Sequence, residues 1–128
     1  MVKILIVDDE RDVEMLYSQR FRKEIRSGLV KLDFAFGGDQ ALDFLRMLES
    51  RDVVLVLSDI NMPGMTGLEL LRTIKTEFTG LKVMMVSAYG DDNNYNSAKL
   101  FGADDFVTKP VNFRVLKEKI EKLTPSTN

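Results

Sequence analysis

Side chains that could carry chemistry follow four short apolar runs in this sequence. Acidic residues follow the first two runs, and a hydroxyl and an ammonium group follow the last two. In open parallel sheets, ligands bind beyond the carboxyl ends of the strands, so groups at those ends would share one edge of the sheet. The groups are Asp8-Asp9-Glu10 after residues 2–7, Ser58-Asp59 after 53–57, Ser87 at the end of 82–87, and Lys109-Pro110 after 105–108.

Carboxylates gathered in this way repel one another, and each would be pushed toward protonation. A hard divalent cation relieves that repulsion, and Mg²⁺ prefers a few carboxylates together with waters and phosphate oxygens. Asp9 and Asp59, with a backbone carbonyl from the following loop, suit such a site. Because carboxylates form acyl phosphates, Asp59 is also a candidate nucleophile toward a phosphoryl group. Mg²⁺, Lys109 and Ser87 would then each neutralise one phosphoryl oxygen.

Each of these groups also has a simpler structural interpretation. Asp8-Asp9-Glu10 could cap a helix, because acids favour a helix N-terminus. Asp59 could form a turn before Pro63-Gly64, Ser87 alone is most often a surface hydroxyl, and Lys109 alone is most often a solvated charge. The chemical interpretation is favoured because separate strand ends each deliver a compatible group.

The elements that must position these groups are short aliphatic runs alternating with amphipathic stretches. Val2–Val7, 53–57, Lys82–Ser87 and Asp105–Thr108 are nearly uninterrupted apolar runs, typical of strands covered on both faces. Residues 29–36 alternate in polarity, which suits an edge strand. Helical patterns cover 13–25, 41–48, 68–78, 91–101 and 113–123, and the polar start of 91–101 predicts a short or mobile helix there.

This alternation predicts right-handed crossovers and a mostly parallel sheet. We therefore predict one doubly wound α/β domain over residues 1–123, with residues 124–128 forming a tail or the start of a linker. A single domain also agrees with the length of 128 residues, of which 45% are hydrophobic and 30% charged.

The composition excludes several classes of function. Cysteine is absent, which excludes disulfides and thiolate metal sites, and histidine is absent, which excludes His-based triads, imidazole zinc sites and phosphohistidine on this chain. A net charge of −2 argues against direct binding of nucleic acid or anionic membranes. Apolar runs fall well short of the roughly 20 residues that span a bilayer, and we expect a cytoplasmic protein.

These residues resemble the receiver domain of two-component response regulators (the CheY-like family), over about residues 3–123. The pattern Asp-x-x-Met-Pro-x-x-x-Gly, which begins at Asp59, is specific to that family when Lys109-Pro110 accompanies it. The resemblance implies a flavodoxin-like (βα)5 sandwich with a parallel sheet in the order 2-1-3-4-5 and helices on both faces. The other matching segments are Val7-Asp8-Asp9-Glu10, Val86-Ser87-Ala88 and Gly102-Ala103-Asp104-Asp105-Phe106.

The resemblance also implies a role for each site residue. Asp59 would be the phosphoacceptor and Lys109 the lysine that binds the phosphoryl group. Asp9, Asp59 and the main-chain carbonyl of Asn61 would hold Mg²⁺, for which Mn²⁺ is an alternative, and Asp8 would act on the ion through water.

A conformational switch follows from two further positions. Ser87 stands at the family's switch hydroxyl, and Phe106 stands at the switch aromatic, where Tyr is frequent; the Lys109–Pro110 bond resembles the family's cis peptide. We expect Ser87 to be drawn to the phosphoryl group and Phe106 to fill the vacated space by packing alone. The face made by 82–87, 91–101, 105–108 and 113–123 would then be remodelled.

The phosphoryl donor must be another molecule, because this chain has no histidine. The resemblance names a phosphohistidine on a sensor histidine kinase or on a histidine phosphotransfer protein. The partners downstream would be an output protein or domain, and a homodimer could use the face that is remodelled. The chain would catalyse its own phosphorylation and dephosphorylation at Asp59 without being a turnover enzyme.

Two residues are expected to control the water that attacks the acyl phosphate. Asn61 and Tyr89 lie two positions beyond Asp59 and Ser87, and their side chains should overhang the phosphoryl group. We expect Tyr89 to shield the site and to lengthen the phosphorylated state, although an ordinary surface aromatic explains Tyr89 equally well.

Other functions fit the sequence less well. A haloacid-dehalogenase-like phosphohydrolase needs a second Asp where Asn61 stands. An FMN-binding flavodoxin would place a hydroxyl- and glycine-rich loop after the first strand, where acids stand instead. P-loop and dinucleotide-binding motifs do not occur. A degenerate receiver that serves only as a docking module is the remaining alternative, and the complete set of acids, hydroxyl and lysine disfavours it.

Overall fold

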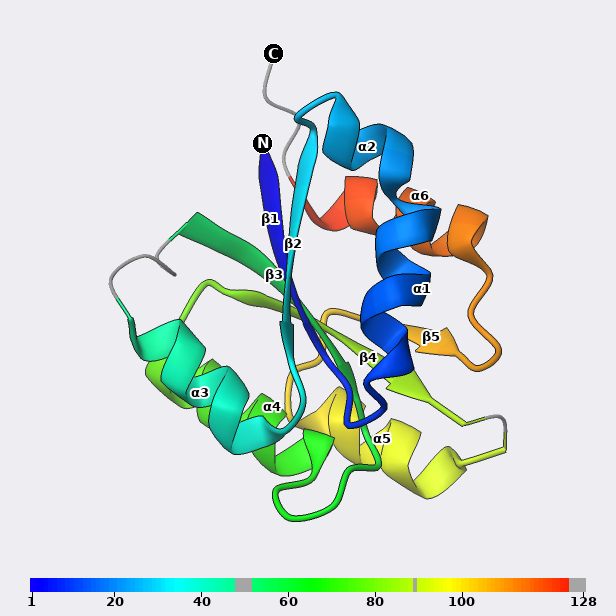
Figure 1. Ribbon diagram of the computed structural model, residues 1–128. Helices are drawn as coiled ribbons and strands as arrows, with labels where there is room; N and C mark the ends of the chain where they lie inside the picture. The colour runs from blue at the N-terminus through cyan, green and yellow to red at the C-terminus, as the bar shows by residue number, and fades with distance from the viewer. Residues whose placement is uncertain (48–51, 89, 125–128) are drawn as a thin grey trace.

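The computed structural model describes residues 1–47, 52–88 and 90–124, and in this part of the chain it confirms the doubly wound α/β fold (Figure 1). All strand pairs are parallel, and the sheet has the predicted order β2-β1-β3-β4-β5. The strands are β1 (Val2–Val7), β2 (Val30–Ala35), β3 (Val53–Asp59), β4 (Lys82–Ser87) and β5 (Asp105–Thr108). The helices are α1 (Asp12–Arg20), α2 (Arg22–Arg26), α3 (Gly38–Arg46), α4 (Gly67–Glu77), α5 (Asp92–Leu100) and α6 (Phe113–Leu123).

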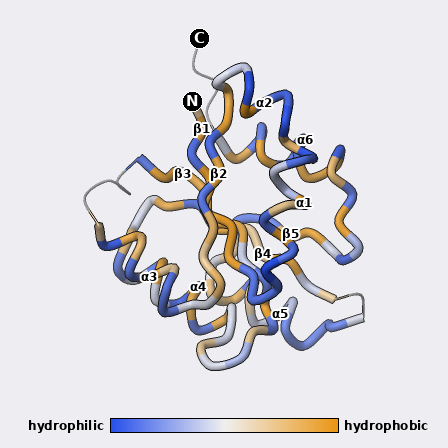
Figure 2. The backbone as a smooth tube through the Cα atoms, in the orientation of Figure 1, coloured by the Kyte–Doolittle hydropathy of each residue, from blue (hydrophilic) through white to orange (hydrophobic). Residues whose placement is uncertain are grey.

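Two apolar layers hold the sheet between the helices. On one face, α3, α4 and α5 pack on the strands through buried residues such as Leu42, Leu71 and Ala98. On the other face, α1 and α6 pack through residues such as Tyr17 and Leu116. The strands between them form an apolar centre (Figure 2), which explains why the central strands read as almost unbroken apolar runs.

The first predicted helix, 13–25, is divided into α1 and α2 at Phe21. The backbone of Phe21 turns to φ −102° and ψ 15°, outside the helical range, while its ring is buried against Phe113. Leu16 and Ile25 recur at helical spacing with the buried Tyr17 and Phe21, but they are 41% and 39% exposed. The apolar spacing continues through the bend, so it does not reveal where the helix direction changes.

Strand boundaries differ from the prediction at two places. β3 extends to Asp59, because Ser58 and Asp59 continue the ladder with Met85 and Val86 of β4. β2 is two residues shorter than 29–36 and lies at the edge of the sheet, as its alternating pattern predicts. The end of the helical stretch at residue 48 and the tail 125–128 fall outside the described residues.

The segment between β3 and α4 is fixed at both ends. The N–H of Gly67 donates to the carbonyl oxygen of Ile60 (2.7 Å), and a side chain at position 67 would collide with the backbone of Asp59 and Ile60. Thr66 and Glu69 form a capping box at the start of α4, each side chain accepting from the other's backbone N–H (3.2 Å). This loop therefore holds the end of β3, where the predicted site lies, in one conformation.

Helices capable of crossing a bilayer are absent from the described residues.

Candidate functional site

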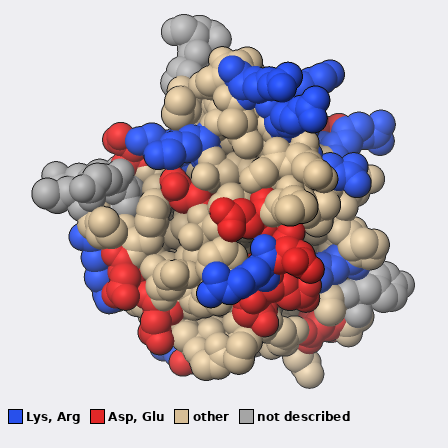
Figure 3. All heavy atoms as spheres, viewed as in Figure 1, with Lys and Arg blue, Asp and Glu red and all other residues tan. Residues whose placement is uncertain are grey.

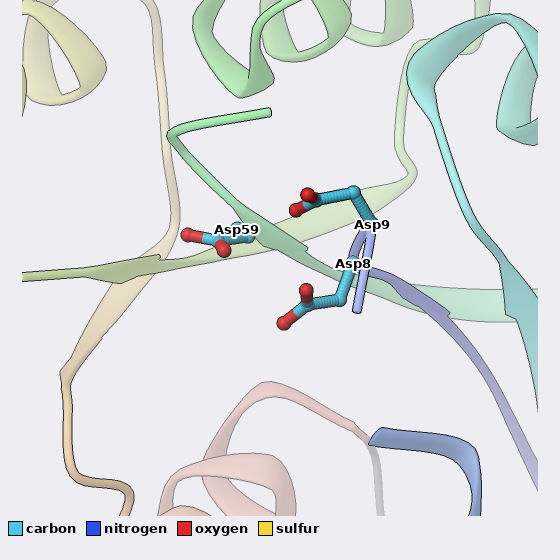
Figure 4. A group of neighbouring side chains, drawn as sticks. All are labelled: Asp8, Asp9 and Asp59. Atoms are coloured by element: carbon cyan, nitrogen blue, oxygen red, sulfur yellow. The ribbon is translucent and has the colours of Figure 1, made fainter. Parts of the chain in front are cut away.

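The carboxyl ends of β1 and β3 bring three acidic side chains together. β1 and β3 are neighbours, with Val7 opposite Ser58, so Asp8 and Asp9 follow β1 beside Asp59 at the end of β3. Carboxylate oxygens of the three residues lie within 4.8 Å of one another (Figure 4). Asp59 is nearly buried at 6% exposure, whereas Asp8 is half-buried and Asp9 is exposed. The three acids therefore lie at one edge of the sheet, as the sequence predicts.

Lys109 joins the same cluster from β5. Its Nζ donates to Oδ2 of Asp59 at 2.8 Å, and its backbone N–H donates to the carbonyl oxygen of Ser87 at 2.9 Å. The Lys109–Pro110 peptide bond is cis. Burial would lower the pKa of Lys109, but its hydrogen bond to Asp59 and the negative charges of Asp59, Asp8 and Glu10 raise it. The ammonium is therefore held in its charged form beside the carboxylates.

The negative charge at this edge exceeds what one ammonium balances. Burial raises the pKa of Asp8, and repulsion from Asp59 and Asp9 raises it further, against the hydrogen bond that Asp8 accepts from the N–H of Glu10 (3.0 Å). Burial and the charges of Asp8 and Asp59 also raise the pKa of the Tyr17 hydroxyl beneath the cluster. Carboxylate oxygens are hard ligands, so this set of donors fits a divalent cation such as Mg²⁺.

The segment after Asp59 connects the site to α5. Asn61 is exposed, and its side-chain amide donates to Asp91 at 3.5 Å, while Asn94 donates to the same carboxylate oxygen at 2.7 Å. The sequence does not predict Asp91 as a site residue. Its only signal in the sequence is the polar run at 90–94, which predicts a turn but not the partner across the sheet edge. Tyr89 lies outside the described residues, so its shielding role stays a prediction.

Ser87 and Phe106 lie on the same face of two adjacent strands. Met85 is opposite Phe106 in the ladder of β4 and β5, and Ser87 is opposite Thr108, which places Ser87 one diagonal step from Phe106. Ser87 is buried and Phe106 is half-buried. The ring of Phe106 packs against Tyr95 of α5, with centroids 4.3 Å apart. The sequence does not predict this contact of Tyr95, because the helical pattern of its segment is weak.

Comparisons with known proteins agree with this arrangement. The sequence profile of the family described as "Response regulator receiver domain" matches residues 4–121. The chemotaxis protein CheY of Pseudomonas aeruginosa is 36% identical over 99% of this chain and 99% of its own length. Sporulation initiation phosphotransferase F of Bacillus subtilis is 33% identical over 96% of this chain and 94% of its own length.

Solved structures extend the likeness to three dimensions. The response regulator protein TrrA of Thermotoga maritima, solved in complex with Mg(2+)-BeF, is 33% identical with a TM-score of 0.77. That match covers 97% of this chain and 100% of TrrA.

Replacing Asp8 by Asn tests whether charge repulsion dominates this cluster. The Asn side chain can still accept from the N–H of Glu10, but it removes a charge that the fold disfavours. At neutral pH with EDTA, we expect the Asp8→Asn variant to have a higher free energy of unfolding than the native chain, because it no longer repels Asp9 and Asp59. With millimolar Mg²⁺ the native chain should gain more stability than the variant, because ligand binding to the folded state stabilises it. Urea denaturation measures both.

The matched control is Asp12→Asn, which changes an exposed acid in the first turn of α1 at the same edge. We expect this control to leave the response to Mg²⁺ intact and not to raise stability, because an acid is favourable at that position. An Asp8→Asn protein that is less stable than the native chain in EDTA would contradict the account.

Proposed function

The chain belongs to the response regulator receiver domain family, and from this premise we propose that it is a signalling switch controlled by phosphorylation of Asp59. Receiver domains are signalling switches rather than classical turnover enzymes. In this proposal, residues 1–123 form the receiver unit. The observation that carries it is the contact of Asp59 with Lys109 at 2.8 Å beside two further carboxylates.

Phosphorylation of Asp59 would be a transfer between two proteins. A carboxylate oxygen of Asp59 attacks the phosphorus of a phosphohistidine on a sensor histidine kinase or histidine phosphotransfer protein. The P–O bond forms as the P–N bond breaks, and the imidazole leaves with its electron pair. Lys109 then exchanges its contact with Asp59 for one with a phosphoryl oxygen, so that its charge offsets the charge that arrives.

Asp9, Asp59 and the main-chain carbonyl of Asn61 would hold Mg²⁺, with Asp8 acting through water and Mn²⁺ as an alternative ion. When bound, the ion neutralises carboxylate and phosphoryl charge in one place. Support comes from the three carboxylates within 4.8 Å, and from the Mg(2+)-BeF complex of TrrA, whose second component is a phosphoryl-like group. The loop between Ile60 and Gly67 keeps the Asn61 backbone next to Asp59.

The response to phosphorylation would run from β4 to α5. Ser87, on the strand end beside Lys109, moves toward the phosphoryl oxygen, and Phe106 rotates into the space beside it. Phe106 has no hydroxyl group to donate, so the change must reach the surface through packing. Its ring contacts Tyr95, which is 39% exposed on α5. The face of β4, α5, β5 and α6 would thus present a different surface to an output partner or to a second copy.

The polar contact between Asn61 and Asp91 supports a tuning role for Asn61. At 3.5 Å the contact is weak, so the amide is free to turn toward a phosphoryl group and to influence the attacking water. In the same movement, Asp91 would lose a partner at the start of α5. Dephosphorylation and the position of α5 would then be coupled through this pair.

Intact-mass measurement tests the phosphoacceptor assignment. After incubation with acetyl phosphate and Mg²⁺, we expect the native chain to gain the mass of one phosphoryl group and the Asp59→Asn variant to gain none. The isosteric amide keeps the fold but cannot form an acyl phosphate. Asp105→Asn is the matched control, because Asp105 is a half-buried acid paired with Lys119 (3.0 Å) away from the cluster. Equal adducts on all three proteins, or none on any, would remove the assignment.

Replacing Ser87 by Ala tests the switch separately from the chemistry. The Ser87→Ala variant should still be phosphorylated on Asp59, since it lacks neither the nucleophile nor Lys109. On phosphorylation, amide hydrogen exchange in α5 should change in the native chain and stay nearly constant in the variant. Ser58→Ala is the control, because the Ser58 hydroxyl donates to the backbone carbonyl of Asp59 (3.0 Å) rather than lying at the end of β4. A normal response of α5 in Ser87→Ala would contradict the switch.

A further inference from the structure

The edge strand β2 presents an unoccupied row of backbone groups. Among the described strands its only neighbour is β1. The N–H of Val2 donates to the carbonyl of Leu29 (2.8 Å) and the N–H of Asp8 donates to the carbonyl of Ala35 (3.1 Å). A strand in a parallel ladder bonds to one neighbour through every second residue. The odd-numbered positions of β2 therefore face β1, and the N–H and C=O groups of Val30, Leu32 and Phe34 point to the open edge.

A groove of about 620 Å³ runs along this edge, between β2 and the helices α1 and α2. Apolar side chains such as Ile25, Leu32 and Phe34 line part of the groove, and its two ends differ in charge. Arg22, Arg26 and Lys31 lie toward the start of the strand, and Glu14 and Asp33 lie toward its end. Figure 3 looks onto this side of the molecule and shows basic side chains gathered over α2, a mostly uncharged centre, and below it acidic side chains with basic ones among them.

We propose that this edge binds the same edge of a second copy of the chain in antiparallel orientation, centred on Leu32. The two copies would be related by a two-fold axis, and their sheets would join into one. Leu32 lies opposite Leu32 of the partner subunit, and Val30 lies opposite Phe34 of the partner subunit. These are the residues whose backbone groups point outward, so each of these pairs exchanges both hydrogen bonds.

The side chains of β2 complement themselves in this register. Val30, Leu32 and Phe34 belong to the apolar layer under α1 and α6, so apolar side chains meet apolar ones on that face. On the opposite face, Lys31 lies across from Asp33 of the partner subunit in a pair without backbone hydrogen bonds, where side chains are closest. Opposite charges in such pairs are favourable.

The charges also select this register against its neighbours. Because outward groups alternate along the strand, the two copies can slide only by two residues at a time. One slide places Lys31 opposite Lys31 of the partner subunit, and the other places Asp33 opposite Asp33 of the partner subunit. Like charges directly opposite each other are destabilising. A charged residue on an edge strand usually prevents pairing with another strand. Lys31 and Asp33 together instead favour the register centred on Leu32 over the two neighbouring registers.

Charged side chains on the helices beside the groove are distributed as they are on β2, with basic residues near its start and an acidic residue nearer its end. Arg22 and Arg26 lie on α2 near the start of β2, and Glu14 lies on α1 nearer its end. In the antiparallel arrangement, the basic end of each copy meets the acidic end of the other. Arg11, which also lies near the end of β2, is directed over the ring of Phe36 at 4.4 Å. Arg22, Arg26 and Glu14 therefore add to the charge complementarity of the strands, whereas Arg11 places a positive charge at the acidic end.

Charge reversal at β2 provides the test, with sedimentation equilibrium as the measurement. We expect the native chain to shift from monomer to dimer as its concentration rises to millimolar. Lys31→Asp or Asp33→Lys alone places like charges opposite each other twice in the dimer, and should weaken dimerisation by roughly tenfold or more. The double variant, Lys31→Asp with Asp33→Lys, restores opposite pairs and should recover the dimer. Circular dichroism checks that each variant is folded.

The control is Leu100→Glu, which changes an 85% exposed side chain on α5, far along the sheet from β2. We expect this variant to dimerise as the native chain does. A native chain that stays monomeric at millimolar concentration would overturn the proposal. Single reversals without effect, or a dimer that Leu100→Glu dissociates, would overturn it as well.

Amide hydrogen exchange gives a second readout that is specific to strand pairing. As the concentration rises, exchange should slow at Val30, Leu32 and Phe34 and stay constant at Lys31 and Asp33, whose N–H groups already bond to β1. Equal slowing at all five positions, or at none, contradicts pairing through this edge. The outcome does not depend on phosphorylation of Asp59, so it can be judged separately from the proposed function.

Discussion

Repulsion between carboxylates at the end of the sheet is the constraint on which the site depends. Three carboxylates lie within 4.8 Å of one another, and the ammonium of Lys109 contacts one of them at 2.8 Å. Burial and the acidic neighbours of Asp8 raise its pKa. The cluster therefore carries negative charge that the Lys109 ammonium does not balance. A cation would complement such a cluster, and under the proposed function it would offset the repulsion between an anionic phosphoryl group and the carboxylate of Asp59.

The fold holds one side of this cluster rigidly and leaves the other adaptable. Asp59 ends a strand in which every residue from Leu55 onward is buried, and the loop after it is tied back through Gly67. Across the sheet, β5 has four residues, and Phe106 is half-buried against a partly exposed tyrosine. We infer that a charge added at Asp59 is accommodated on the β4, β5 and α5 side, because fewer well-packed contacts must be lost there.

Sequence patterns predict the parts of the structure that depend on burial and on strand ends. Unbroken apolar runs predict the central strands, alternation predicts that β2 is an edge, and their order brings Asp8, Asp9, Asp59 and Lys109 together. The bend at Phe21 is not predicted, because apolar spacing continues through it. The contacts of Asp91 with Asn61 and of Tyr95 with Phe106 are not predicted either, because each joins exposed or half-buried residues across elements whose helical pattern is weak.

The most direct measurement is an NMR titration of the chain with Mg²⁺ and beryllofluoride, separately and together. We predict that beryllofluoride binds tightly only when Mg²⁺ is present, and that the amide signals of Asp59, Ser87 and Lys109 then shift together. We also predict that Asp9→Asn weakens the binding of both components. Beryllofluoride binding that is independent of Mg²⁺, or that is unaffected by the loss of the Asp9 charge, would contradict the claim that one cluster serves both the cation and the phosphoryl group.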